Sequence, residues 1–231
     1  MTGNERDAHG RLIGELADLV RLASTALSEV ADGLTVPQPP AGGTHAGTLE
    51  EGVTAAEKAL SELRERIEED AAGVLRNSSL QVSDRHAIVV GVHVGTEVEC
   101  LADLVELLLR LAWSRQSAAR WPDRLRVPLH GMGTVVPAML AEAADLLESE
   151  DTEAGADLLA TFHEVVQRQR LLYELLLSSA EPAAAGETAD ATLLACYYQR
   201  CAGHAVSIAR HAALFAATAR GSDRARGVGE K

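Results

Sequence analysis

Three carboxylates lie along one side of an apolar segment, TEVECLADLVELLLRLA, at residues 96–112. Glu99, Asp103 and Glu106 follow one another at intervals of four and three residues, so on a helix they share one face. Like charges at this spacing repel by roughly 0.2–0.5 kcal/mol a pair unless something positive lies between them. Carboxylates suit cations such as Mg²⁺, Ca²⁺, Mn²⁺ or iron, and Glu57 could supply a further ligand from a neighbouring helix. The spacing therefore predicts a divalent cation site.

The same acidic stripe also fits a solvated surface. A mostly buried helix still presents one face to water, and this stripe is narrow. Arg110 follows Glu106 by four residues and could answer its charge. The residues alone leave both interpretations open.

The histidines are paired along the sequence in a way that argues against a metal site on one helix. His86 and His93 lie seven residues apart, as do His204 and His211. Seven residues are two helical turns, so each pair shares a face but is too far apart for one ion. We therefore interpret these histidines as core or surface side chains and not as metal ligands.

The three cysteines give no sign of a zinc site or a disulfide framework. Cys100, Cys196 and Cys201 are odd in number and have no C-x-x-C spacing. They are interpreted as reduced thiols that pack as small apolar side chains. Because the chain also lacks a Gly-rich phosphate loop and a defensible Ser-His-Asp arrangement, nothing in it predicts catalysis.

The composition favours a helical, intracellular protein. Acidic residues outnumber basic ones by 34 to 21, a formal charge of −13, which opposes binding to nucleic acid. Cations or basic protein surfaces are better partners. Leu and Ala dominate and only 3% of residues are aromatic, as expected for an all-α chain. The N-terminus has no apolar run typical of a signal peptide, and no uncharged stretch approaches the ~20 residues that span a bilayer. We expect a cytoplasmic protein.

The first half of the chain reads as three helices. Apolar residues recur every three or four positions over residues 11–34 and again over 49–75, separated by a Pro- and Gly-rich loop at 35–48. A third helix is predicted over 85–118. Its first part, 86–98, is β-branched enough to suggest a strand, but a lone strand would have no partner, so helix is favoured.

The second half repeats this order. WPDRLRVP breaks the chain at 121–128, and helical patterns resume beyond it. Three helices are expected, followed by a disordered polar tail. The predicted segments are a helix over 135–149, a helix over 154–179, a loop at 181–191, a helix over 192–219 and the tail at 221–231.

The closing helices of the two halves are related in sequence. VECLADLVELLLR at 98–110 and YQRCAGHAVSIAR at 198–210 lie one hundred positions apart, which suggests a duplicated three-helix unit. With LQVSDRHAIV at 80–89, this pattern resembles the PhoU family of phosphate-uptake regulators. In that family a loop of the form P-x-A-x-D-L-R precedes a helix of the form L-E-R-I-G-D-H-A-V-N-I-A, once per repeat.

The resemblance implies a fold and a set of partners. Family members are built from six main helices as two tandem antiparallel three-helix bundles, expected here at 8–120 and 127–220. They act with the ATPase of a phosphate transporter and with a sensor histidine kinase. The family also implies a metal site in some members, formed by E/D-x-x-x-D pairs.

The two signatures differ in the residues they keep. The first retains the acidic pair as Glu99 and Asp103, whereas the second has Gln199 and Gly203 at those positions. Glu57 stands where the second helix of a family repeat often carries an acid. The resemblance therefore implies one cation site, for Mg, Mn or Fe, held by Glu99, Asp103 and Glu57 in the first repeat only.

The second signature keeps a different part of the motif. Arg200 and His204 remain, together with the small apolar residues that follow them. His204 is therefore the histidine for which a role beyond packing is worth testing.

Three functions follow as hypotheses. The first is a non-enzymatic regulator of phosphate uptake and phosphate-responsive signalling that docks a transporter ATPase or a sensor kinase, and that could form a homodimer. The second is a metal-loaded helical bundle, although the chain has no E-x-x-H pairs on its apolar helices. The third is a degenerate adaptor that binds an unrelated partner through the same scaffold.

Overall fold

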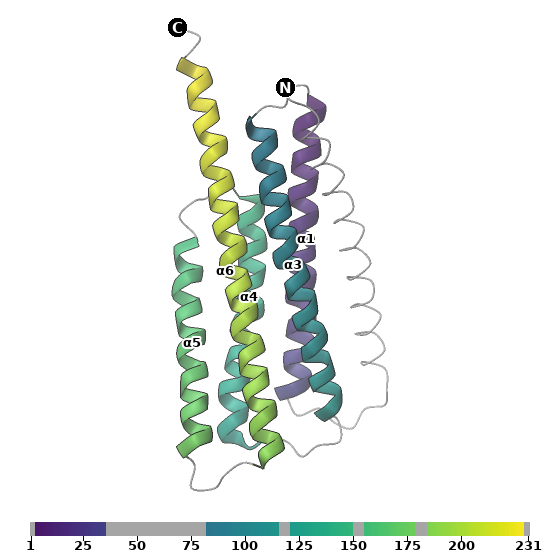
Figure 1. Ribbon diagram of the computed structural model, residues 1–231, viewed down its shortest axis with the longest axis vertical. Coiled ribbons are helices and arrows are strands. Elements are labelled where there is room, and N and C mark those ends of the chain that lie inside the picture. The colour runs from purple at the N-terminus through teal and green to yellow at the C-terminus, as the bar shows by residue number, and fades with distance from the viewer. Residues whose placement is uncertain (1–2, 36–81, 116–120, 150–154, 179–183, 229–231) are drawn as a thin grey trace.

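The protein is a bundle of long helices in a computed structural model that describes residues 3–35, 82–115, 121–149, 155–178 and 184–228. These residues form five helices and no strand, which confirms the all-α prediction (Figure 1). The loop predicted after residue 35 and the helix predicted over 49–75 lie outside the described residues, so the sixth helix stays a prediction. The helices are α1 (Gly3–Thr35), α3 (Val82–Arg115), α4 (Asp123–Glu148), α5 (Gly155–Ser178) and α6 (Ala185–Val228).

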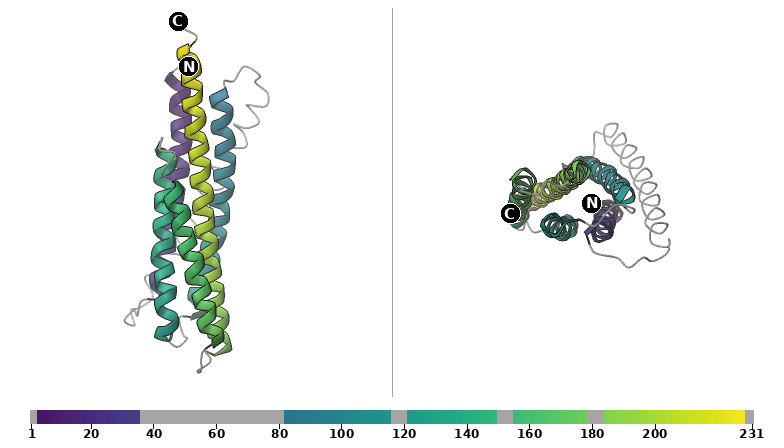
Figure 2. Two further views of the ribbon diagram at one scale, coloured as in Figure 1. Left: turned by 90° about the vertical axis from the view of Figure 1, so that its left-hand side faces the viewer. Right: turned by 90° about the horizontal axis from the view of Figure 1, so that it is seen from below.

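Four helices surround the main core and the fifth flanks it. α1 packs on α3, α3 on α6, α6 on α4, and α4 on α1, while α5 packs on α4 and α6 (Figures 1 and 2). The chain reverses direction from α4 to α5 and from α5 to α6, so these helices form one antiparallel three-helix unit. Among the described helices, α1 and α4 share the widest contact, which joins the first half of the chain to the second.

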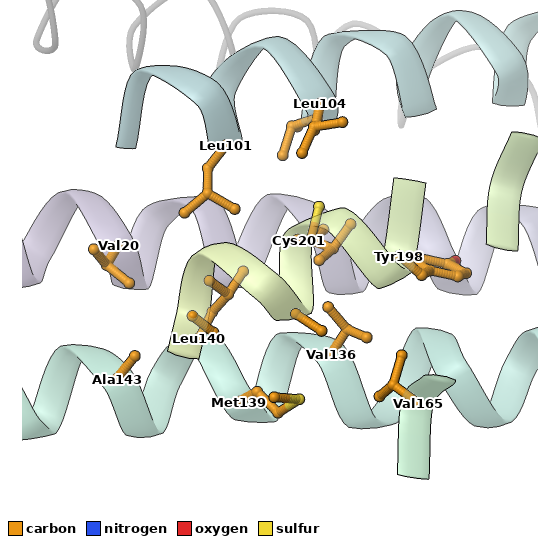
Figure 3. Close-up of a cluster of buried hydrophobic side chains, with 14 of the residues drawn as sticks. Val20, Leu101, Leu104, Val136, Met139, Leu140, Ala143, Val165, Tyr198 and Cys201 are labelled. Carbon is orange, nitrogen blue, oxygen red and sulfur yellow. The ribbon is translucent and has the colours of Figure 1, made fainter. Parts of the chain in front are cut away.

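The core is one continuous cluster with side chains from all five helices. Figure 3 shows its centre, where Val20 of α1 and Leu101 of α3 meet Leu140 of α4 and Cys201 of α6. Each fully buried Leu or Val side chain contributes about 1.5–3 kcal/mol relative to an exposed one. The two halves of the chain therefore share their apolar interior, and the predicted boundaries between the two repeats stay a prediction.

The β-branched start of α3 is helical because of its period. Val90, Val94 and Val98 are buried at intervals of four residues, and Leu101 continues the same stripe. A strand would place Leu101 on the opposite face from the three valines, and it would leave its backbone N–H and C=O groups unpaired. Burial of a helical stripe outweighs the weak helix propensity of valine.

A close approach between helices occurs at Gly133 in α4. A Cβ atom at this position would lie 2.8 Å from the Cβ of Ala31 and 2.9 Å from the hydroxyl of Tyr198, so only glycine fits. Pro137, one turn later, lacks the N–H that would pair with the Gly133 carbonyl. The carbonyl of Pro137 itself accepts a hydrogen bond from the Ser24 hydroxyl at 2.8 Å.

Three predicted helix starts are wrong. α1 begins at Gly3, eight residues before the start that the apolar period predicted at residue 11. α4 begins at Asp123, inside the segment predicted to break the chain, because Pro122 serves as the cap and buried Leu125 and Leu129 anchor the first turns. The loop predicted at 181–191 is helical from Ala185, where alanine favours helix.

The C-terminal tail also differs from the prediction. α6 continues to Val228 instead of ending near residue 219, so most of the segment predicted to be disordered is helical. In Figure 1 this end of α6 extends past the neighbouring helices. Among the residues that the structure describes, no helix is both long and apolar enough to cross a membrane.

Candidate functional site

The negative charge of the acidic stripe on α3 is partly neutralised by a basic side chain of the same helix. Arg110 forms an ion pair with Glu106 at the i, i+4 spacing, as the solvated-face interpretation predicted. Asp103 is exposed, and Glu99 is half-buried. The stripe therefore lies along the wet edge of the helix.

The described residues alone do not complete a cation site at these carboxylates. Glu99 and Asp103 offer two carboxylates from one helix. Ca²⁺ and Mg²⁺ bind six or more oxygen atoms, and for Ca²⁺ the protein usually supplies several of them. No group of three or more His, Cys, Asp or Glu side chains in the described ranges is arranged to hold an ion. The third predicted ligand, Glu57, lies outside these ranges, so the site stays a prediction.

The corresponding positions of the second half are occupied as the sequence indicated. Gln199 is half-buried, and the Cα of Gly203 faces the ring of Phe162, which would lie 3.8 Å from an added Cβ. Neither position offers a carboxylate.

A polar cluster lies elsewhere, between α3 and α6, and joins the two halves of the chain. The carboxylate of Glu97 holds two side chains of α6 at once. Its Oε2 lies 2.5 Å from Nδ1 of His204, and its Oε1 accepts a hydrogen bond of 2.5 Å from the hydroxyl of Ser207. His204 and Glu97 keep 19% and 21% of their side-chain surface exposed. We call Glu97, His204 and Ser207, with His93 and His211 one turn further along, the α3–α6 seam.

Two histidines continue the seam. The rings of His93 and His211 stack with their centroids 4.8 Å apart and their planes 4° from parallel. Burial lowers the pKa of His211, the charge of His93 lowers it further, and Glu97 opposes this by raising it. The stack is therefore most stable with His211 neutral.

The charges at the other end of the seam act on Cys100. Burial raises the pKa of its thiol, the carboxylates of Glu97 and Asp103 raise it further, and Arg200 lowers it. Arg200 is thus close enough to α3 for its charge to be felt there, one turn before His204 on α6. All three cysteines are free thiols, as predicted, and burial raises the pKa of Cys201 to about 12.

Sequence reasoning missed Glu97 and Ser207. Glu97 stands four residues after His93, and Ser207 lies three after His204 and four before His211, so both spacings mark polar side chains on one helix face. The sequence contains this signal. It does not show which face of α3 packs against which face of α6, because Glu97 and His204 are 107 residues apart.

The chemistry available to the seam is that of a fixed carboxylate beside imidazoles. A carboxylate accepts hydrogen bonds and orients an imidazole by one of its nitrogens. The seam can therefore fix the tautomer of His204, and the single residue Glu97 of α3 contacts two side chains of α6.

Comparisons with known proteins agree on one family. A family model described as the PhoU domain matches residues 129–212, which run from α4 through α5 into α6. Two curated proteins from Mycobacterium bovis and Mycobacterium tuberculosis, both called "Phosphate-specific transport system accessory protein PhoU homolog 2", are 25% identical to the chain over 170 residues. The aligned part covers 74% of this chain and 79% of each relative.

The fold is similar to that of a solved structure. PhoU from Pseudomonas aeruginosa superposes with a TM-score of 0.77, covering 93% of this chain and 98% of that one, at 16% sequence identity. This likeness establishes that the helical architecture is shared.

Proposed function

Because the chain is a divergent member of the PhoU family, we propose that it is a non-enzymatic regulator of phosphate uptake and of phosphate-responsive signalling. The observation that carries this proposal is the family match over α4, α5 and α6, together with the two curated relatives that are named as phosphate-transport accessory proteins. Accessory action needs a rigid surface that a partner can recognise. A bundle with one continuous core supplies such a surface.

The proposed partners are the ATPase subunit of a phosphate transporter and a sensor histidine kinase, met in the cytoplasm. The formal charge of −13 supports contacts with basic protein surfaces and opposes contacts with nucleic acid. A homodimer is compatible with the same mode of action. In this proposal the chain changes what its partner does and carries out no reaction of its own.

The α3–α6 seam supports a regulatory role because it links the two halves of the chain. A partner that binds and moves α6 would displace Glu97, because His204 and Ser207 both contact its carboxylate. Polar contacts between helices can have two discrete arrangements, which is what a signal-dependent adaptor requires.

The test is to delete the gene in its host and to measure phosphate uptake and the expression of phosphate-responsive genes at high and at low phosphate. Deletion should leave uptake or expression high when phosphate is abundant, and the intact gene should restore control. A tagged chain should recover the transporter ATPase or the kinase from cells. Unchanged phosphate control in the deletion strain would overturn the proposal.

The alternative is an adaptor of the same fold with an unrelated partner. It is supported by the loss of both acids from the second signature, at Gln199 and Gly203. The two proposals differ in the deletion strain. The adaptor alternative expects normal phosphate control and a tagged chain that recovers neither phosphate component.

A further inference from the structure

The two ring nitrogens of His204 have different surroundings. Nδ1 faces the carboxylate of Glu97 at 2.5 Å, and no other hydrogen bond joins His204 to a residue in the described part of the chain. An ionised carboxylate can only accept, so in the neutral ring Nδ1 must carry the hydrogen. The lone pair then lies on Nε2, the nitrogen that acts as a nucleophile.

We propose that His204 is a phosphoryl-acceptor site whose donor is an acyl phosphate, the mixed anhydride of a carboxylic acid and phosphoric acid. Such a donor is formed on a phosphorylated aspartate of a partner protein or exists free as acetyl phosphate. Histidine is among the side chains that form covalent intermediates by nucleophilic attack. This proposal concerns a modification of the chain and does not depend on the phosphate-regulatory function proposed above.

The transfer is balanced without any further reactant. The Nε2 lone pair forms a bond to phosphorus, and the bond between phosphorus and the carboxylate oxygen breaks. The carboxylate leaves with that electron pair, and no proton moves in this step because Nε2 carries none. The ring becomes a cation that still holds its hydrogen on Nδ1, and the adjacent charge of Glu97 stabilises it.

The charged side chains that α6 brings near His204 are positive. Gln199 and Gly203 stand where the family motif has acids, so α6 brings no carboxylate next to the ring. Arg200 lies one turn before His204, is exposed, and forms no ion pair with another described residue. On α3, the carboxylates of Glu97 and Asp103 have the opposite sign. Asp103 is exposed, so its charge is screened by water and salt, and the charge of Glu97 is compensated by the ring cation that the transfer creates.

Glu97 is a positioning residue in this proposal. It holds the tautomer and balances the ring charge, and Ser207 fixes the other oxygen of its carboxylate. A purely structural contact with Glu97 would impose the same tautomer on His204, so the labelling rate of Glu97→Gln is what separates a positioning role from a structural one. The tautomer is measured first because attack by Nε2 requires it.

Nitrogen NMR of the full chain measures it directly. Long-range ¹H–¹⁵N spectra of protein labelled at histidine distinguish the Nδ1–H from the Nε2–H form. We expect neutral His204 in the Nδ1–H form. A predominant Nε2–H form would overturn the proposal, since the nucleophilic nitrogen would then be blocked.

The second measurement is labelling with acetyl phosphate, followed by mass spectrometry under alkaline conditions, which preserve phosphohistidine. The parent should gain one acid-labile phosphoryl group on His204. His204→Gln should gain none there, and Glu97→Gln should be labelled about tenfold more slowly, the factor carried by a charge-assisted hydrogen bond.

Matched variants separate this site from general reactivity and from unfolding. His163→Gln removes an exposed histidine on α5 and should leave labelling of His204 unchanged. Ser207→Ala removes the hydrogen bond that fixes the other oxygen of Glu97 and should slow labelling of His204, but by less than Glu97→Gln does. Circular dichroism verifies that each variant is folded. Labelling spread equally over exposed histidines, or an unlabelled His204 in the folded parent, would overturn the proposal.

Discussion

His93 of α3 and His211 of α6 stack almost parallel, with ring centroids 4.8 Å apart, although 118 positions of sequence separate them. A second proton on this pair would place two like charges in contact. Burial acts in the same direction, and both effects lower the pKa of His211 from its ordinary value of 6.5. The stack therefore makes the stability of the fold depend on pH.

The first prediction is that acid weakens the fold through His211. Its pKa is lower in the folded chain than in the unfolded chain, so the unfolded chain takes up the proton first as pH falls. Stability from this group is complete above about pH 6.5 and is lost as pH falls below it. Denaturant unfolding from about pH 7.5 to about pH 5.5 should show a larger loss in the parent than in His211→Gln.

The pH dependence of the parent and of His211→Gln can be compared only if the other groups that face His211 titrate similarly in both proteins. His93 and Glu97 face it from α3, and Arg210 lies next to it on α6. All three are present in the parent and in the variant, so their own titration largely cancels in the difference. His163→Gln on the exposed face of α5 is the control and should keep the slope of the parent. Equal slopes for the parent and His211→Gln would contradict the prediction.

The second prediction is that Gly133→Ala destabilises the bundle. Alanine in place of a helical glycine usually stabilises by about 0.5–1 kcal/mol. Here the new Cβ would meet Ala31 at 2.8 Å and Tyr198 at 2.9 Å, and overpacking typically costs about 1–3 kcal/mol. The net effect should be a lower Tm.

The control for this substitution is Gly33→Ala. Gly33 is also helical, and nothing lies within 4 Å of the Cβ it would gain. This variant should be as stable as the parent or slightly more stable. If Gly133→Ala had the same Tm as Gly33→Ala, the prediction would be wrong, and α1 and α4 would separate at little cost in free energy.

The sequence predicted the type of each described helix, since the 3.6-residue period survives unusual composition. Val90, Val94 and Val98 have poor helix propensity, yet helix was correctly predicted here because a lone strand would have had no partner. Helix ends were less predictable. Pro128 suggested a break, but packing of the neighbouring Leu125 and Leu129 holds that turn in α4.

The seam could not be predicted for a different reason. The acidic stripe was found because its members lie close together in sequence. Glu97 became important only through the rotation and the register of α6 against α3, which bring His204 to its carboxylate. These quantities depend on the packing of the whole core, so a single helix does not encode them.

The third prediction compares two arginines that bridge helices. Arg115 is 7% exposed, lies 3.6 Å above the ring of Trp121 and pairs with Asp190 at 2.8 Å. It therefore joins the end of α3 to the starts of α4 and α6. Arg115→Met leaves Asp190 without its partner and should cost about 2–4 kcal/mol, somewhat less than a fully buried pair because Asp190 is partly exposed.

Arg21 is the matched comparison on the surface. It pairs with Asp145 and Glu148 across α1 and α4, but 36% of its side chain is exposed. Arg21→Met should cost at most about 1 kcal/mol. Chemical denaturation of both variants measures the difference, and equal losses would show that burial does not govern these bridges.

The last prediction concerns the cation site proposed for Glu99, Asp103 and Glu57. If these carboxylates hold one ion, Mn²⁺, Mg²⁺ or Fe²⁺ should raise the Tm of the parent, by a stabilisation of about 2.7 kcal/mol at one hundred times Kd. The variant with Glu99→Gln and Asp103→Asn should not respond, and Glu57→Gln should respond less than the parent. Without metal, the double variant should be at least as stable as the parent, because it removes a like-charge pair from one helix face. A parent that ignores all three ions up to millimolar concentration would refute the site and leave the stripe as the wet edge of α3.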